Sequence, residues 1–212
     1  QFTDKSYGIQ VPIGGENGLS ENVLNGDYTI GMWVKTNADI CRLFTIVKEG
    51  DHYVDLVKGR YRMDLGGRMG SFYYPGLEKI PNNDSWNYVF FRREKGASDG
   101  GTFSGNCTIG LIDEDGKLHT SSYGIYELSA DVQNKPKALV IGMQKLDESL
   151  GLSPEDRTTM SQDSTLLIDE FRVYSRALSD NEIPRSYDRM LSGNEQGIAL
   201  YWPMNERYPT GY

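Results

Sequence analysis

The sequence predicts an all-β protein with one short helix near its C-terminus. The first observation is composition: 24 glycines, 14 tyrosines and 8 prolines among 212 residues favour strands joined by tight turns. The second is periodicity, because apolar and polar residues alternate in short runs and uninterrupted helical periods are few. The third is length, which suffices for one sizeable core, so we expect a single domain over 1–212.

The first third of the chain carries the clearest strands. In 27–35, Tyr28, Ile30, Met32 and Val34 alternate with polar or small residues, which indicates a strand with one buried face. Turn pairs at Glu49-Gly50 and Lys58-Gly59 predict a meander. The strands expected in this part are 2–11, 27–35, 40–47, 52–57 and 60–65.

The middle of the chain predicts shorter strands and longer connections. We expect strands at 85–93 and 106–113 on either side of a soft loop, 94–105, and a hairpin turn at Asp115-Gly116 that leads into 117–121. A strand at 137–143 precedes the polar segment 144–163, which is too long for an ordinary connection. The last strand, 198–204, contains Pro203, so it should lie at an edge or end at the proline.

The run STLLIDEFRVY at 164–174 predicts another strand. The alternation places Leu167, Asp169, Phe171 and Val173 on one face, and the other face carries Ile168, Glu170, Arg172 and Tyr174. An ionised carboxylate on an apolar face is costly unless it is paired. We therefore expect Asp169 to meet backbone N–H groups, a basic side chain or a cation.

A helix start follows this strand. Ser179 and Glu182 have the spacing of a capping box. In this motif the serine hydroxyl accepts a hydrogen bond from the amide of the residue three positions later, and the glutamate side chain accepts one from the serine amide. Because Pro184 cannot donate a helical hydrogen bond, we expect one turn at 180–183 and a restart with Pro184 near the first helical position. Gly193 is the expected end.

These residues carry a resemblance. The stretch IDEFRVYSRALSDNEI resembles the closing motif of laminin G-like domains of the concanavalin A-like lectin/glucanase superfamily, which typically reads I-D-E-hydrophobic-R-hydrophobic-Y-x-R-A-L-S-x-x-E-I. Shorter echoes, YTIGMWVKT, WNYVFFRRE and ALVIGM, follow in the family's order and extend the match over most of the chain. The resemblance implies a two-sheet antiparallel jelly-roll sandwich.

One segment departs from the family. ALYWPMNE at 199–206 resembles the segment that usually opens such a domain, yet it stands near the end of this chain. Either a permuted strand fills the usual first position, or the segment pairs only locally.

Charge and composition exclude several classes of partner. A net charge of -8 repels phosphate backbones, and no basic stretch is interleaved with aromatics, so we expect no nucleic acid partner. No apolar run approaches a membrane span. Since Gln1 begins in sequence that already has a strand pattern, we expect any signal peptide or anchor to have been removed. Cys41 and Cys107 are too few for a disulfide scaffold, and buried thiols are favoured over a bridge.

Catalytic patterns are missing from the sequence. Retaining glucanases of the superfamily present carboxylates in a Glu-x-Asp-x-x-Glu pattern, which this chain lacks. The acidic run at 113–115 lies on a predicted hairpin, where solvated charge is the simpler interpretation. His52 and His119 have no local partner pattern and are interpreted as structural or surface residues. The sequence therefore predicts that the chain is not an enzyme.

The resemblance implies a structural calcium ion, because laminin G-like domains often hold one through oxygen ligands near their termini. Asp169 is the best candidate ligand. The family's opening strand commonly reads F-D-G-x-x-D-Y, whereas this chain reads FTDKSY at 2–7, so Asp4 stands one position from the expected aspartate. The alternative is that Asp169 accepts backbone amides or pairs with an arginine.

A cluster of aromatic and polar residues at 60–75 is the candidate ligand surface. Sugar C–H faces stack on aromatic rings while sugar hydroxyls bond to arginine and aspartate. The alternative is that these rings cap the core. The candidate ligand-binding residues are Tyr61, Arg62, Asp64, Tyr73 and Tyr74.

Together these features favour a noncatalytic carbohydrate-binding or adhesion module of a secreted or cell-surface protein, with a glycan as ligand. Two alternatives stay open. One is a glycoside hydrolase of the same fold with atypical carboxylates. The other is a structural module that packs on a neighbouring domain of a larger protein.

Overall fold

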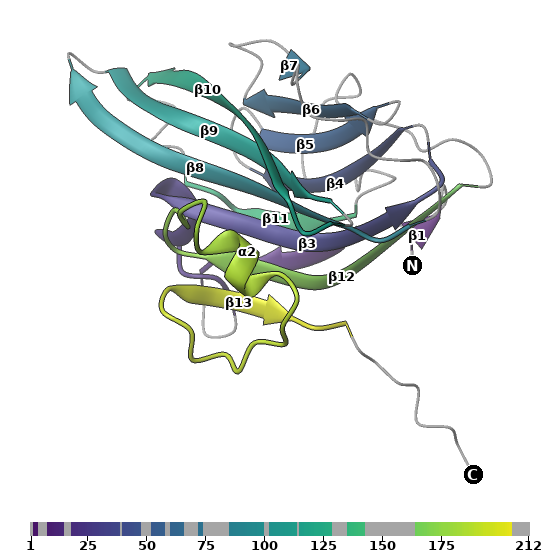
Figure 1. The fold of residues 1–212 in the computed structure, drawn as a ribbon. Helices are drawn as coiled ribbons and strands as arrows, with labels where there is room; N and C mark the ends of the chain where they lie inside the picture. The colour runs from purple at the N-terminus through teal and green to yellow at the C-terminus, as the bar shows by residue number, and fades with distance from the viewer. Residues whose placement is uncertain are drawn as a thin grey trace.

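Two antiparallel sheets stack face to face (Figure 1). They are seen in a computed structural model that describes residues 2–3, 8–14, 18–38, 40–47, 52–57, 60–65, 72–73, 85–99, 102–113, 115–128, 135–142 and 164–204. Of these, the backbone alone is described for 2–3, 40, 52–57, 60–65, 72–73, 97–99, 102–104, 123 and 125–128. The first sheet has seven strands in the order β1-β12-β3-β8-β9-β10, and β13 also pairs with β12. These strands are β1 (Phe2–Thr3), β3 (Tyr28–Thr36), β8 (Asn87–Asp99), β9 (Thr102–Ile112), β10 (Leu118–Leu128), β12 (Thr165–Tyr174) and β13 (Ile198–Trp202).

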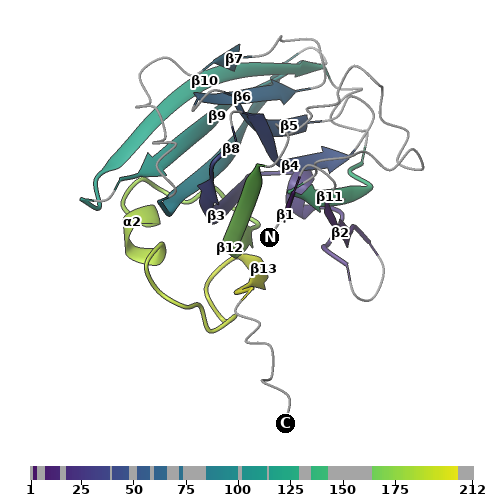
Figure 2. The ribbon, with the colours of Figure 1, turned by 90° about the vertical axis from the view of Figure 1, so that its right-hand side faces the viewer.

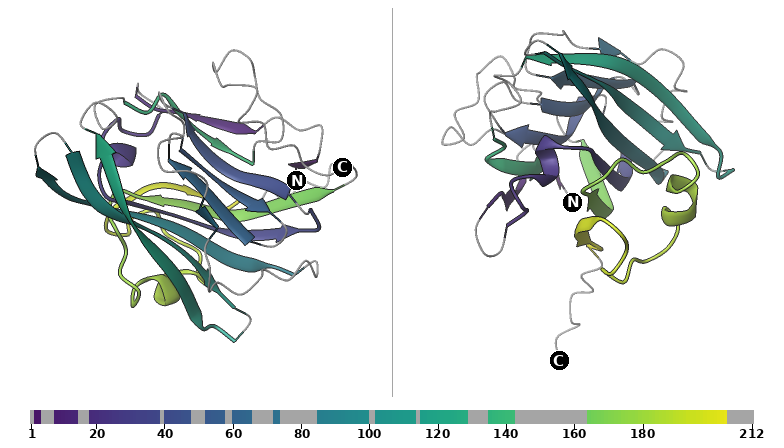
Figure 3. Two further views of the ribbon diagram at one scale, coloured as in Figure 1. Left: turned by 90° about the horizontal axis from the view of Figure 1, so that it is seen from above. Right: turned by 90° about the vertical axis from the view of Figure 1, so that its left-hand side faces the viewer.

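The second sheet has six strands in the order β2-β11-β4-β5-β6-β7. Its strands β4 to β7 follow one another along the chain, which confirms the predicted meander. Figure 3 shows the two layers from two further directions. The strands are β2 (Ile9–Pro12), β4 (Ile40–Val47), β5 (His52–Val57), β6 (Arg60–Leu65), β7 (Phe72–Tyr73) and β11 (Ala138–Ile141). The two-sheet antiparallel sandwich expected from the resemblance is confirmed.

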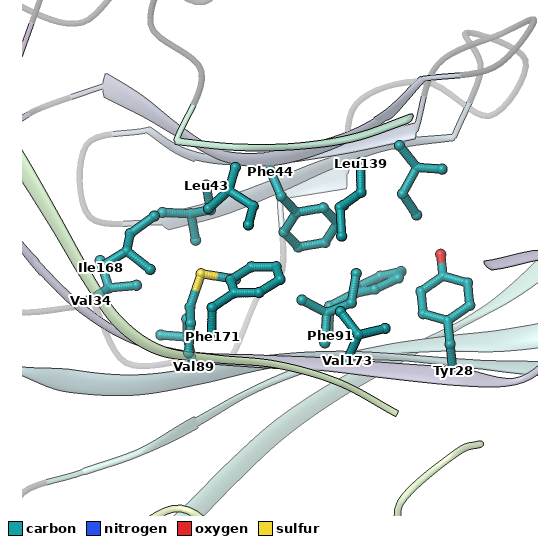
Figure 4. Close-up of a cluster of buried hydrophobic side chains, with 14 of the residues drawn as sticks. Tyr28, Val34, Leu43, Phe44, Val89, Phe91, Leu139, Ile168, Phe171 and Val173 are labelled. Atoms are coloured by element: carbon teal, nitrogen blue, oxygen red, sulfur yellow. The ribbon is translucent and has the colours of Figure 1, made fainter. Parts of the chain in front are cut away.

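The core lies between the inner faces of the sheets. Figure 4 shows Leu43, Phe44 and Leu139 of the six-stranded sheet pointing toward Phe91 and Phe171 of the seven-stranded sheet. The face of β3 predicted to be buried does line this core, with Tyr28, Ile30, Met32 and Val34 each at most 1% exposed. Cys41 and Cys107 are buried in the same core as thiols, as predicted.

The alternation expected for β12 is wrong in its first half. Leu166 and Ile168 belong to the core, and so do Phe171 and Val173, so the inward set changes from even to odd numbers. The cause is a β-bulge: the pairing with β3 shifts register between Asp169 and Arg172, and Glu170 has a positive φ of 51°. Leu167 is therefore only half-buried.

The loop predicted at 94–105 is replaced by strand. β8 and β9 continue toward each other, pairing Asp99 with Thr102, and a register shift between Lys95 and Ser98 absorbs the irregular sequence. Long-range pairing with a neighbouring strand has overridden weak local strand propensity. The hairpin turn at Asp115-Gly116 is confirmed, with Gly116 at φ 76°, but β10 runs on to Leu128 rather than Ser121.

Both chain ends differ in detail from expectation. The single strand predicted at 2–11 is divided: β1 pairs with β12 in one sheet, and β2 pairs with β11 in the other. β13 pairs locally with β12 on the edge that β1 also uses, and it ends at Trp202 before Pro203, as expected. Predicted segment 144–163 lies outside the described residues.

The residues between β12 and β13, 175–197, form a closing segment that covers the outer face of the seven-stranded sheet. Figure 2 shows its helix α2 (Ile183–Ser186) on the side of β3 and β8 that faces away from β4 and β11. Pro184 lies in the first turn, as predicted, but the helix ends at Ser186 and not at Gly193. The physical reason is that Arg172 takes the carbonyl groups of Ser186 and Arg189, so the chain leaves the helical path early. In the described part of the chain, no helix is long and apolar enough to cross a bilayer.

Candidate functional site

The predicted ligand surface is placed only in part. Tyr61, Arg62 and Asp64 lie on β6, and Tyr73 lies on β7, where it is the backbone partner of Arg62. Two of the five residues are thus neighbours across the edge of the six-stranded sheet. Phe72 and Tyr73 form a two-residue strand at this point, and Tyr74 lies outside the described residues.

The predicted calcium ligands are likewise placed in part. Asp4 lies outside the described residues. Asp169 is half-buried at the bulge of β12, where its Oδ1 accepts the Glu170 amide at 2.8 Å, so the expected backbone N–H partner is confirmed. Burial raises the pKa of Asp169, and the Glu170 amide opposes this shift. Among the described residues no group of three or more His, Cys, Asp or Glu side chains converges on a metal-sized site, so Asp169 alone supplies no calcium cage there.

The structure supports a structural role for His119, as predicted. Its Nε2 lies 2.7 Å from Asp113 Oδ2 across the β9–β10 hairpin. The bond to His119 is the main cause that lowers the pKa of Asp113, and the Lys117 amide adds to it. The pair therefore holds the hairpin turn.

A pocket that sequence reasoning did not find lies in the closing segment. Its volume is about 320 Å³. Cationic and anionic side chains share its wall with two buried apolar ones. The lining residues of this closing-segment pocket are Tyr174, Arg176, Leu178, Glu182, Arg185, Ser186, Arg189, Glu195 and Gln196.

The floor of the pocket rests on a buried arginine network. Arg172, 0% exposed, projects from the outer face of β12 and donates to the carbonyls of Ser186 and Arg189 and to Glu170 Oε2. Glu170 Oε2 also accepts the Tyr201 hydroxyl at 2.6 Å. Because Leu166 and Ile168 point into the core, regular alternation would turn Arg172 inward as well, and the bulge at Glu170 places it on the outer face instead. Arg172 thus fixes the end of α2 and the turn after it, which carry Arg185 and Arg189.

Aromatic side chains seat the helix beside the network. Trp33, Tyr88 and Tyr187 form a mutual cluster with ring centroids 5.6 to 5.8 Å apart, and Trp33 Nε1 donates to the Tyr187 carbonyl. Gly31 leaves the room for Tyr88, since a Cβ there would stand 2.2 Å from the Tyr88 hydroxyl. The closing segment is therefore a fixed part of the sandwich.

Two more residues on the sheet hold the start of the closing segment. Thr29 Oγ1 donates to the Arg176 carbonyl and accepts the Leu178 amide. Arg92 donates to the Leu178 carbonyl and to Asp180, both at 2.7 Å. The pocket wall near Arg176 is therefore positioned by β3 and β8.

Both carboxylates of the pocket are held by nearby backbone. Glu182 Oε2 accepts the amide and hydroxyl of Ser179, so half of the predicted capping box is confirmed, while the hydroxyl bonds to Glu182 instead of an amide. Glu195 repeats the arrangement with the amide and hydroxyl of Ser192. The repeated Ser-x-x-Glu spacing, with arginines between the two copies, is the sequence signal that could have indicated this site.

Glu182 gives a testable pH dependence. The bond from Arg176, reinforced by Ser179, lowers its pKa from 4.5 to about 2. A group whose pKa falls on folding stabilises the fold above its unfolded pKa and loses that contribution as the pH falls. We expect the difference in unfolding free energy between wild type and Glu182→Gln to be constant above pH 5 and to shrink between about pH 4.5 and 2. Urea unfolding at stepped pH measures it, and a difference that stayed constant down to pH 2 would contradict the assignment.

The chain is similar in structure to the mouse laminin alpha1 chain, domains LG4-5, with a TM-score of 0.50 and 15% sequence identity. The match covers 91% of this chain and 44% of that chain, so the chain spans less than half the length of the laminin fragment. No protein-family model and no curated protein sequence matches the chain. At this identity the likeness concerns the fold.

The class that the fold defines is the laminin G-like sandwich. The strand pairing and the helix-bearing closing segment agree with the resemblance carried by IDEFRVYSRALSDNEI. The chain therefore has the fold of a laminin G-like domain.

Proposed function

We propose that the chain is a noncatalytic carbohydrate-binding or adhesion module of a secreted or cell-surface protein. The observation that carries the proposal is the closing-segment pocket, a hollow of about 320 Å³ whose lining is mostly charged and polar side chains. Ligand sites are commonly preformed hollows of roughly this size. The laminin G-like fold supports both the binding role and a place outside the cell.

The same pocket argues against hydrolysis. A glycosidase needs one carboxylic acid with a raised pKa to protonate the leaving oxygen. Instead the pKa of Glu182 is lowered, chiefly by Arg176, and that of Glu195 is lowered, chiefly by the Ser192 amide. Both groups are ionised at neutral pH and neither serves as a general acid. The alternative of a hydrolase with atypical carboxylates is therefore disfavoured at this pocket.

A glycan array on the full chain tests the proposal, with an oligosaccharide hydrolysis screen beside it. We expect binding to at least one glycan class and no cleavage. An array without any binding would contradict the proposed carbohydrate binding, and turnover of an oligosaccharide would favour the hydrolase. The array should be repeated with Tyr73→Ala, because Tyr61, Arg62, Asp64, Tyr73 and Tyr74 remain the proposed second ligand surface.

A structural calcium ion held by Asp169 and Asp4 stays a proposal. Asp169 Oδ2 accepts no hydrogen bond among the described residues, so this oxygen is the one open to a cation. A ligand that binds only the folded state raises the melting temperature by mass action. We expect chelation to lower the melting temperature, and we expect Asp169→Asn to abolish that difference. Identical melting curves with calcium and with chelator would rule the ion out.

A further inference from the structure

Two arginines of the closing-segment pocket have no counter-ion in the part of the chain that the structure describes. Arg185, in α2, and Arg189, in the turn after it, are exposed, and in the described structure neither guanidinium makes a hydrogen bond or an ion pair. The other three arginines of this region are engaged: Arg92 with Asp180, Arg172 with Glu170, and Arg176 with Glu182. Two guanidinium groups at one hollow, both free of an ion pair in the described structure, are the donors that a planar anionic group would bind.

The pocket also keeps two acceptor positions. A carboxylate has about four acceptor sites. Glu182 uses three of them, for the Ser179 amide, the Ser179 hydroxyl and Arg176, which leaves a site on Oε1. Glu195 likewise uses three, for the Ser192 amide, the Ser192 hydroxyl and the Gly193 amide, which leaves a site on Oε2. Groups that fit such positions are hydroxyls, which donate without adding charge.

A ligand that satisfies both the arginines and the free acceptor positions of the pocket carries one anionic group together with several hydroxyls. We propose that the closing-segment pocket binds a sugar residue that carries a single carboxylate, a hexuronic acid or a sialic acid. Arg185 and Arg189 hold the carboxylate, and Glu182, Glu195 and the Gln196 amide take the hydroxyls. The assignment rests on the proposed glycan-binding function and names its ligand class.

Competing ligands fit the same groups less well. A polysulfated chain would bring several negative charges against Glu182 and Glu195 on a protein of net charge -8. An acidic peptide offers the carboxylate but not the hydroxyls. A neutral sugar offers the hydroxyls and leaves both guanidinium groups unpaired. The volume, about 320 Å³, suits one or two sugar residues rather than a chain.

The experiment titrates the full chain, followed by NMR, with four small probes. Methyl β-D-glucuronide and the methyl glycoside of N-acetylneuraminic acid represent the two sources of the carboxylate. Methyl β-D-glucoside has the glucuronide ring without its charge, and N-acetylglutamate amide has the charge without the ring. We expect at least one acidic sugar to bind ten-fold or more tightly than the neutral ring and the amino acid.

Variants locate the site. Arg185→Gln and Arg189→Gln should each weaken acidic-sugar binding about 10- to 100-fold, the usual loss for a hydrogen bond to a charged group. Lys137→Gln is the matched control, because it removes one exposed positive charge before β11, in the other sheet, and should leave binding unchanged. Since both arginines are exposed, melting curves of the two variants should coincide with wild type, which separates lost binding from lost folding.

The possible outcomes distinguish this ligand assignment from the alternatives. Neutral glycans that bind on the array while the acidic probes do not would overturn this assignment and leave the proposed function standing. An array without any binding would overturn the carbohydrate-binding part of the proposed function and this assignment with it. Equal binding of N-acetylglutamate amide and the acidic sugars would favour an acidic protein partner. Acidic-sugar binding unchanged in both arginine variants would place the site elsewhere.

Discussion

Replacing Arg172 with alanine should lower the free energy of unfolding by about 3–5 kcal/mol, the usual loss when one partner of a buried ion pair is removed. Three bonds go with the guanidinium, to Glu170 and to the carbonyls of Ser186 and Arg189. Its contacts over the Tyr88 and Tyr201 rings, each at 5.8 Å, are lost as well. Urea unfolding followed by tryptophan fluorescence measures the change.

Arg176→Ala is the matched control for this result. Its side chain is 32% exposed, and its ion pair with Glu182 lies at the surface, where such pairs contribute up to about 1 kcal/mol. Equal destabilisation by the two alanine variants would contradict the network described here.

A second pair of variants tests the cause. If the uncompensated Glu170 carboxylate accounts for much of the loss, Arg172→Met combined with Glu170→Gln should be more stable than Arg172→Met alone, because the amide still accepts the Tyr201 hydroxyl without a buried charge. A double variant less stable than the single one would show that Glu170 is stabilising by other contacts.

Leu166→Ala should cost about 2–5 kcal/mol of unfolding free energy, the range for a truncated core leucine, whereas Leu167→Ala should cost about 1 kcal/mol. The bulge at Glu170 is the reason for the difference. Leu166 is 0% exposed and lies in the core, while Leu167 faces outward and is half-buried. Regular alternation along β12 predicts the opposite order.

Paired denaturation curves of the two alanine variants decide the matter. Phe171→Ala serves as the positive control, because Phe171 is buried in either register and should cost about 3–5 kcal/mol. If Leu167→Ala proved the more damaging of the two leucine changes, β12 would lack the bulge.

The sequence by itself determined the class of fold and most of the strands. Alternation located β3 and its buried face, and turn pairs located β4, β5 and β6 at their observed bounds. These features are local: a strand with one wet face and one dry face has to show a two-residue period, and a tight turn has to show glycine or a small polar residue. The closing motif added the family likeness, which the fold confirms.

Tertiary structure alone decided the features that depend on a partner strand. The bulge in β12 and the extension of β8 and β9 arise from pairing with neighbours, whose register a single run of residues does not encode. The early end of α2 depends on Arg172, which precedes it in sequence by eleven residues and reaches it only once β12 has joined the sheet.

The closing-segment pocket is also a feature that only the tertiary structure decided. Its lining comes from residues 174 to 196, but its hollow exists because Arg172, Arg92 and Thr29 hold the segment against the outer face of the seven-stranded sheet. The sequence displayed the charged residues, and only the folded chain shows which of them neutralise one another. Within the described residues, Arg185 and Arg189 are left without counter-ions because the backbone and Arg176 already hold the nearby carboxylates.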